Sequence, residues 1–188
     1  MTQPLDGIER EIKLRFGEAG LAREAILGVG ATPSRGRRLQ EDFLLDADDN
    51  RLQDRQSVLR VRTEQGRSLL TFKGPVQPSP MKLREERETV AADGETLLYI
   101  LEQLGFHVWF RYQKYREEFG WKDAVIALDE TPIGVFVEIE GSEQTIVEAA
   151  SALGRSATDY ITDSYRALYL RDCKSRGVER GDMVFDED

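Results

Sequence analysis

The segment Ile8–Phe16 constrains the fold more than any other, because its side chains alternate between charged and apolar. Successive side chains of a β-strand point to opposite faces of the sheet. The charged side carries Glu9, Glu11, Lys13 and Arg15, the apolar side carries Ile8, Ile12, Leu14 and Phe16, and only Arg10 is out of place. This alternation predicts a strand with one charged face and one apolar face.

The same pattern recurs in later segments. The same-face charged sets are Arg60 and Arg62; Lys73; Arg84, Glu86 and Glu88; Lys114 and Arg116; Asp129; and Glu138 and Glu140. For any one strand a solvated charged face is the simpler interpretation, because charged residues mostly lie in water. Most of these sets are sorted by sign, however, which brings no benefit on a solvent face. If helices cover the apolar faces of a curled sheet, the charged faces point into a shared interior.

Turn residues and periodicity predict a largely antiparallel α+β fold. We expect strands at 8–16, 39–45, 57–63, 68–73, 82–90, 109–119, 124–129 and 134–140, and helices at 18–27, 95–104, 142–153 and 158–173. Asp93 and Ser142 are expected to cap two of the helices, since short polar side chains can accept from free backbone N–H groups. Residues 1–176 are expected to form one domain, and residues 177–188 an acidic, disordered tail.

Charge and composition narrow the classes of function. The chain has 26 Lys and Arg against 35 Asp and Glu, with a net charge of -9, which disfavours a nucleic-acid-binding protein. Cys173 is the only cysteine and His107 the only histidine, so no intrachain disulfide can form and a thiolate zinc cluster is excluded. The polar N-terminus and the absence of a long apolar run indicate a reduced cytoplasmic protein that does not span a membrane.

An interior lined by both signs of charge suits a phosphate-rich ligand. A triphosphate carries about four negative charges and needs charge-assisted hydrogen-bond donors. Such donors are available from Arg60, Arg62, Lys73, Arg84, Lys114 and Arg116. The carboxylates would instead bind Mg²⁺ or Mn²⁺, hard ions that accept carboxylate and phosphate oxygens together.

The charged segments, taken in order, resemble the motifs of the CYTH superfamily, the triphosphate tunnel metalloenzymes. Glu9–Lys13 is similar to the ExExK signature, and Asp42 lies in a stretch similar to the family's second strand. The later matches are Leu59–Arg62 to the RxR strand, Leu70–Pro75 to the lysine strand and its turn, Arg84–Glu88 to RxExE, Lys114–Arg116 to KxR, Asp129 and Glu138–Gly141 to the late aspartate and ExE strand, and Ser164–Leu168 to the SYxxL helix of the class IV adenylate cyclase-like branch. The resemblance covers about residues 8–170. Leu44, where that branch often has tyrosine, and the tail after residue 176 depart from it.

The resemblance implies a closed eight-stranded antiparallel barrel with a tunnel through it, helices outside, and a homodimer. It implies metal ligands at Glu9, Glu11, Asp129, Glu138 and Glu140, and triphosphate-binding residues at Lys13, Arg60, Arg62, Lys73, Arg84, Lys114 and Arg116. Lys13 and Glu86 are the candidate catalytic residues. Lys13 could help to activate the nucleophile as a base only if its pKa is lowered; neighbouring cations would lower it, whereas Glu9 and Glu11 would oppose this.

Three functions remain open on the sequence. The first, which we favour, is metal-dependent hydrolysis of inorganic triphosphate or a small organic triphosphate such as thiamine triphosphate. The second is a class IV-type adenylate cyclase, which makes cyclic AMP and pyrophosphate from ATP. The third is a non-catalytic module that binds polyphosphate or nucleotide. His107 is expected to have a structural or surface role and Cys173 a packing role. Trp109 and Trp121 could stack on a nucleobase, but we expect both to pack instead.

Overall fold

Eight antiparallel strands close into a barrel in the computed structural model, which describes residues 7–186. The strand order around the barrel is β1-β5-β4-β3-β2-β6-β7-β8, and β8 pairs with β1 to complete the ring. The strands are β1 Ile8–Phe16, β2 Thr32–Ala47, β3 Val58–Glu64, β4 Arg67–Lys73, β5 Lys82–Ala91, β6 Phe106–Trp121, β7 Ala124–Thr131 and β8 Gly134–Glu140. The prediction of a closed eight-stranded antiparallel barrel is confirmed.

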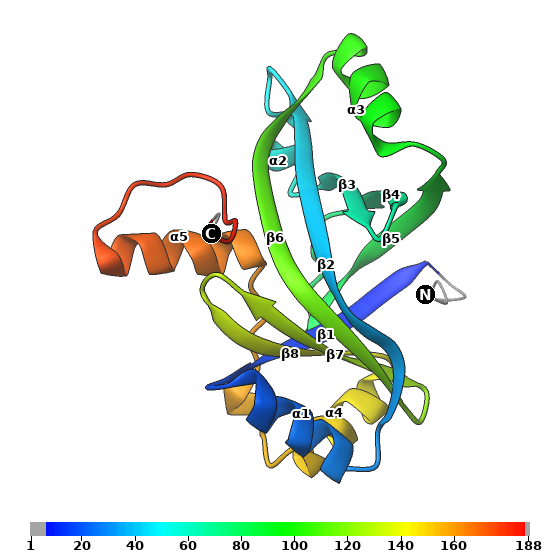
Figure 1. The fold of residues 1–188 in the computed structure, drawn as a ribbon, viewed down its shortest axis with the longest axis vertical. Helices are drawn as coiled ribbons and strands as arrows, with labels where there is room; N and C mark the ends of the chain where they lie inside the picture. Colours follow the sequence, from blue (N-terminus) through cyan, green and yellow to red (C-terminus); the bar gives the residue numbers. More distant parts are fainter. Residues whose placement is uncertain (1–6, 187–188) are drawn as a thin grey trace.

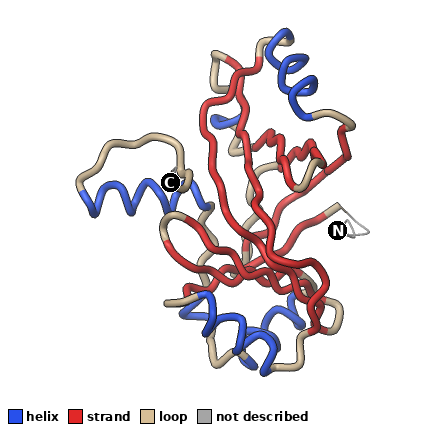
Figure 2. The backbone as a smooth tube through the Cα atoms, viewed as in Figure 1, coloured by secondary structure: helices blue, strands red, loops and turns tan. Residues whose placement is uncertain are grey.

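The helices lie outside the barrel, as predicted (Figures 1 and 2). They are α1 Ala19–Gly28, α2 Arg51–Asp54, α3 Gly94–Gln103, α4 Glu143–Ala152, the 3₁₀ turn η1 Ala157–Asp159 and α5 Tyr165–Arg176. Asp93 accepts from the backbone N–H of Thr96, and Ser142 from that of Thr145, so both predicted caps are confirmed. Among residues 7–186, no helix has the length and apolar character needed to cross a membrane.

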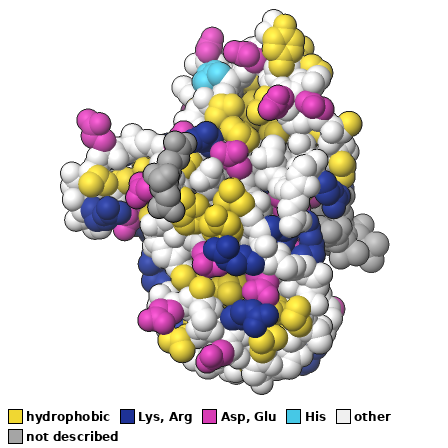
Figure 3. Space-filling model, in the orientation of Figure 1, with side chains coloured by type: hydrophobic (Ala, Val, Ile, Leu, Met, Phe, Trp, Pro, Cys, Tyr) yellow, Lys and Arg dark blue, Asp and Glu magenta, His cyan; other side chains and the backbone are white. Residues whose placement is uncertain are grey.

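The largest hydrophobic core lies between the barrel wall and the helices α1 and α4, which pack side by side below it in Figure 1. Ile12 and Leu14 of β1 are fully buried there against Ile26 of α1 and Ile146 of α4. Because side chains alternate along β1, burying this apolar face outward turns Glu11 and Lys13 inward. Charged side chains of both signs are also scattered over the outer surface (Figure 3).

Strands β2 and β6 are both much longer than predicted. They pair with each other from Thr32 opposite Gly120 to Ala47 opposite Phe106, with register shifts along the way. The predicted strand at 39–45 began too late because Pro33 and Gly36 weaken a local strand signal. Pairing between the two long strands, together with the bulges, holds this part of the chain extended.

The prediction of a single last helix over 158–173 was wrong. Ile161 instead exchanges backbone hydrogen bonds with Lys13 of β1, at 3.0 and 2.9 Å. This extended bridge is incompatible with a helix, so α5 begins only after Ser164, whose side chain accepts from the N–H of Ala167. The short helix α2 was also missed; it is held by Asp46, which accepts from the backbone N–H groups of Leu52 and Gln53.

The described part of the C-terminal tail packs on the barrel, although the sequence predicts disorder there. Met183 is 1% exposed and exchanges backbone hydrogen bonds with Arg111 and Gln113 of β6. Phe185 packs against Tyr115, with ring centroids 5.2 Å apart. The contacts form because this half of β6 lacks β7 as a neighbour and presents free backbone groups. The predicted tail also includes residues 187–188, which lie outside the described residues.

Candidate functional site

The barrel encloses a cavity of about 930 Å³, at the upper end of the range usual for small-molecule sites. Nearly all of the residues singled out from the sequence line it. They are Glu9, Glu11, Lys13, Arg60, Arg62, Lys73, Arg84, Glu86, Lys114, Arg116, Glu138 and Glu140. Asp129 is fully buried and contacts two of the lining residues, Lys114 and Arg116. The barrel therefore gathers side chains that are far apart in the sequence.

One wall of the cavity is acidic and is formed by β1 and β8. Glu11 and Glu140 are directly opposite each other in the register of these strands. Glu9 accepts hydrogen bonds from Lys73 Nζ at 2.7 and 2.8 Å. Glu11 Oε1 accepts from Lys13 Nζ at 2.8 Å and from Lys82 Nζ at 2.7 Å. Like charges placed directly opposite each other across strands are unfavourable, so this wall is a natural position for added positive charge.

The pKa values of these buried carboxyl groups are shifted from their ordinary values. Burial, with help from Glu9 and Glu11, raises the pKa of Glu140 to about 8. Burial also raises the pKa of Glu9 to about 7, although Lys73 opposes the shift. Burial acts to raise the pKa of Glu11 too, but Lys13 and Lys82 outweigh it and hold that pKa well below its ordinary value.

The acidic wall offers the right donors for a hard divalent cation. The Glu140 carboxylate forms no hydrogen bond or ion pair with any other residue of 7–186, and carboxylate oxygens are the ligands that Mg²⁺ and Mn²⁺ prefer. Within the same residues, no three acidic, histidine or cysteine side chains are grouped so that they could hold a metal ion. Glu9, Glu11 and Glu140 thus match such an ion in the type of their donor atoms, but they do not form a three-ligand group.

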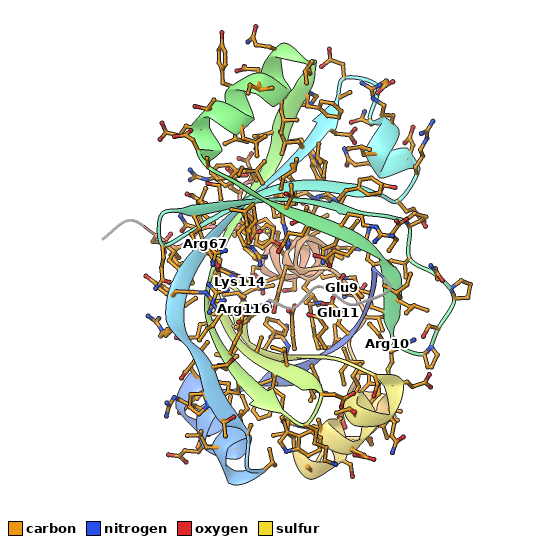
Figure 4. All side chains as sticks on the ribbon, turned by 90° about the vertical axis from the view of Figure 1, so that its right-hand side faces the viewer. Glu9, Arg10, Glu11, Arg67, Lys114 and Arg116 are labelled. Carbon is orange, nitrogen blue, oxygen red and sulfur yellow. The ribbon has the colours of Figure 1, made fainter. Side chains whose placement is uncertain are left out.

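The opposite wall is dominated by cations of β6. Figure 4 shows Lys114 and Arg116 facing Glu9 and Glu11 across the barrel. Lys114 Nζ lies 2.8 Å from Asp129 Oδ2, and Arg116 Nε lies 2.7 Å from Asp129 Oδ1. Arg116 also contacts Glu138. Burial, reinforced by Arg116, lowers the pKa of Lys114 to about 8 despite Asp129 and Glu138.

Asp129 and Glu138 lie among these cations; the resemblance implied metal ligands at both positions, and that role stays a prediction. Asp129 also accepts a hydrogen bond of 2.7 Å from the hydroxyl of Tyr165 on α5. Glu138 lies 3.2 Å from Lys13 Nζ and 4.0 Å from Lys114 Nζ. The contacts of Asp129 thus hold Lys114 and Arg116 in place. Glu138 links these two cations to Lys13 on the acidic wall.

Strand β3 supplies a second pair of cations. Arg62 donates to Asp42 at 2.8 and 3.2 Å, and Arg60 lies 3.3 Å from the same carboxylate. Burial would raise the pKa of Asp42, but Arg62 and Arg60 outweigh it and lower the pKa. Asp42 thus stays ionised and orients both guanidinium groups toward the cavity, which they line.

Arg84 has a different role from the other cations. Its guanidinium group donates to the carbonyl oxygens of Gly74, Lys73 and Gln56. These bonds connect β5 to the two loops that follow α2 and β4. Arg84 therefore supports the rim of the cavity, and much of its donor capacity is already used there.

The candidate catalytic residues both have strong ionic partners. Burial would lower the pKa of Lys13, but Glu11 and Glu138 outweigh it and raise the pKa above its ordinary value. Burial would raise the pKa of Glu86, but Lys73 and Arg60 hold it at about 2. Near neutral pH Lys13 is therefore a cation, and the base role considered from the sequence is opposed by its carboxylate neighbours. Glu86 is ionised and could orient a nucleophile.

Several buried polar residues of the interior were missed by sequence reasoning. They are Arg38, Gln40, Glu64, Lys82, Glu118 and Tyr165. Half of them could have been found by extending the alternation, since Glu64 follows Arg62, Glu118 follows Arg116 and Lys82 precedes Arg84 at a spacing of two. Of the remaining candidates, Trp109 lines the cavity. Trp121 donates to Val29 O, Cys173 is buried, and His107 is largely exposed.

Comparison with known proteins agrees with this geometry. The family described as the CYTH domain matches residues 7–165. A protein of Methanocaldococcus jannaschii, named "putative adenylate cyclase", is 29% identical over 172 residues, which cover 86% of this chain and 98% of that protein.

Two solved structures have the same fold. A "putative adenylate cyclase" of Vibrio parahaemolyticus superposes with a TM-score of 0.75 at 20% identity, covering 86% of this chain and 97% of that one. A Hippeastrum protein superposes with a TM-score of 0.65 at 17% identity, covering 92% of this chain and 97% of that one. The latter is described as a "putative adenylyl cyclase" that reveals a dominant triphosphatase activity.

Proposed function

Because the chain belongs to the CYTH domain family, we propose that it is a divalent-metal-dependent enzyme that hydrolyses inorganic triphosphate or a small organic triphosphate. The observation that carries this proposal is the separation of charge across one cavity. Glu9 and Glu11 of β1 face Lys114 and Arg116 of β6 across the barrel. A triphosphate between these walls would meet donors on one side and a metal-binding edge on the other.

The binding part of the mechanism follows from contacts already present. Arg60 and Arg62 are oriented by Asp42, and Lys114 and Arg116 by Asp129. Preoriented cations stabilise the charge on a transferring phosphoryl group at little reorganisation cost. We assign them to holding the phosphate chain in line for attack.

The acidic wall would complete the site. Glu9, Glu11 and Glu140 would hold Mg²⁺ or Mn²⁺, and such an ion would supply positive charge against the phosphate oxygens. Lys13 lies between Glu11 and Glu138 and, as a cation, stabilises negative charge on the phosphate. Glu86, ionised beside Lys73, is positioned to orient the attacking water rather than to donate a proton.

A class IV-type adenylate cyclase is the second candidate, and the end of the cavity near α5 favours it. That end is lined by the apolar side chains of Leu44, Val58 and Trp109, which could accommodate a nucleoside. The same phosphate-binding groups would serve both reactions, which differ in whether water or a ribose hydroxyl attacks.

One incubation series distinguishes the candidates. The protein is supplied with inorganic triphosphate, thiamine triphosphate or ATP, with Mg²⁺ or Mn²⁺, while orthophosphate, pyrophosphate and cyclic AMP are followed. We expect metal-dependent release of orthophosphate. Cyclic AMP together with pyrophosphate from ATP would replace hydrolysis by the cyclase reaction. Binding of triphosphate without turnover of any substrate would instead indicate a non-catalytic binding module.

A further inference from the structure

A network of mostly buried polar and ionic side chains joins the neighbouring strands β3, β2 and β6 beyond the proposed phosphate-binding residues. Arg38 donates to Glu64 Oε2 at 2.9 Å and to Glu118 Oε1 at 2.5 Å. Arg35 donates to Glu64 Oε1 at 2.6 Å and lies 3.9 Å from Glu118. Gln40 adds a hydrogen bond of 2.7 Å to Glu64. We call these five residues the ion network.

The ion network continues the cation-bearing strands in one direction. Glu64 follows Arg62 on the inner face of β3, and Glu118 follows Arg116 on the inner face of β6. Arg38 is opposite Arg116 in the register of β2 and β6 and donates to the Arg116 carbonyl oxygen. A phosphate chain that extended past Arg62 and Arg116 along these strands would therefore meet the network.

The network also contributes to a boundary between two cavities. A second cavity of about 370 Å³ is lined by Glu64 and Arg67. Arg35 and Glu88 line both this cavity and the main one. Arg67, labelled in Figure 4, belongs to the second cavity only. Arg35 and its carboxylate partner Glu64 thus stand between the proposed triphosphate site and further space.

Cations are less accessible at this boundary than in the main cavity. Arg60, Arg62, Lys114 and Arg116 line the main cavity, although Asp42, Asp129, Glu86, Glu88 and Glu138 all lie within ion-pair distance of them. Arg38, by contrast, lines neither of the two cavities. In the ion network, cations and carboxylates are equal in number and fully engaged with one another. Burial would raise the pKa of Glu64, but hydrogen bonds from Gln40, Arg35 and Arg38 outweigh it and hold the pKa at about 2. An additional phosphate would meet ionised carboxylates there and no free positive charge.

We propose that the ion network sets the length of the phosphate chain, with Glu64 and Glu118 as the residues that exclude linear polyphosphates longer than triphosphate. The inference rests on the proposed function, because it presupposes that the main cavity binds the triphosphate group. A negative charge removed from the network would leave Arg38 or Arg35 with donor capacity for a fourth phosphate. The chain could then extend toward Arg67.

The test uses Glu118→Gln and Glu64→Gln, which keep side-chain shape and remove one charge each. Glu117→Gln is the matched control, because Glu117 is adjacent on β6 but pairs with Arg23 of α1 on the outside. Binding of tripolyphosphate and tetrapolyphosphate is measured by calorimetry, and turnover of both by phosphate release, with thermal melting as the check on folding. If Glu64→Gln does not fold, Glu118→Gln suffices, because Glu118 has fewer close donors than Glu64.

We expect the wild-type chain and Glu117→Gln to prefer tripolyphosphate. Glu118→Gln should raise the ratio of tetrapolyphosphate to tripolyphosphate affinity by about tenfold, the order expected for one charge at this range in a protein interior. An unchanged ratio in a folded Glu118→Gln variant would refute the length stop. Equal binding and turnover of tripolyphosphate and tetrapolyphosphate by the wild-type protein would refute it as well. Binding of tripolyphosphate without turnover would overturn only the proposed hydrolysis, since the affinity ratio still reports on the network.

Discussion

Replacing Asp129 by Asn gives the most direct test of how the cationic wall is held. The Asp129 carboxylate is fully buried and accepts from Arg116, Lys114 and Tyr165. The amide removes the negative charge and leaves two buried cations with Glu138 as their main remaining partner. Breaking a buried ion pair from one side typically costs about 3–5 kcal/mol, a large part of the roughly 5–15 kcal/mol that stabilises a domain.

The assay is urea unfolding at neutral pH in the presence of EDTA, with the free energy of unfolding extrapolated to water. Glu130→Gln is the control, because Glu130 is adjacent on β7 and pairs with the half-exposed Arg37; its loss should cost less than about 1 kcal/mol. We also expect added triphosphate to stabilise Asp129→Asn more than the wild-type protein, since the anion replaces the missing charge. If Asp129→Asn in EDTA lowers the free energy of unfolding no more than Glu130→Gln does, the assignment of Asp129 to the cations is refuted.

Three further perturbations address the acidic wall and the tail. Glu11→Gln or Lys73→Ala should abolish turnover and leave a folded protein, measured by phosphate release and circular dichroism; near-normal activity of both would contradict the inward-facing site. In metal-free protein, Glu140 keeps its proton up to about pH 8 while the unfolded chain loses it near its ordinary pKa, so this group makes stability fall as pH rises between these values. Glu140→Gln should remove this contribution, so its free energy of unfolding, measured by urea titration between pH 5 and 8, should fall less with pH than that of the wild-type protein. Identical pH profiles for the two proteins would refute the raised pKa of Glu140. Met183→Ala should cost about 2 kcal/mol and make the C-terminal segment sensitive to limited proteolysis, whereas unchanged resistance would show that the segment does not depend on this contact.

Most strands could be predicted because alternation is a local property, whereas the closed eight-stranded barrel was implied by the resemblance to the CYTH superfamily. The inward direction of Glu9, Glu11 and Lys13 follows from the period of a strand and the need to bury Ile12 and Leu14. The same reasoning located most of the cavity lining. It failed at the last helix, since the Lys13–Ile161 bridge joins segments far apart in the sequence.

Roles within the site depended on contacts that no local pattern encodes. Asp129 and Glu140 are both inward carboxylates in the sequence pattern. The Asp129 carboxylate contacts two cations and a tyrosine, whereas the Glu140 carboxylate has no hydrogen-bond partner among the described residues. Arg84 resembles the other cations in sequence, but its guanidinium group is largely used by carbonyl oxygens. Such differences arise from the stagger of the strands around the barrel.

The sequence by itself determined that charged side chains of sorted sign would face one interior, because a strand that buries its apolar face must turn its charged face the other way. Only the tertiary structure decided which charges meet. Closing the barrel brings β1 between β5 and β8, and that register sets Glu11 against Lys82 and Glu140 while Arg116 reaches Asp129 and Glu138. Interactions between charges depend steeply on distance and burial, so the division into an acidic wall, a cationic wall and a neutral boundary appears only once the strands are in place.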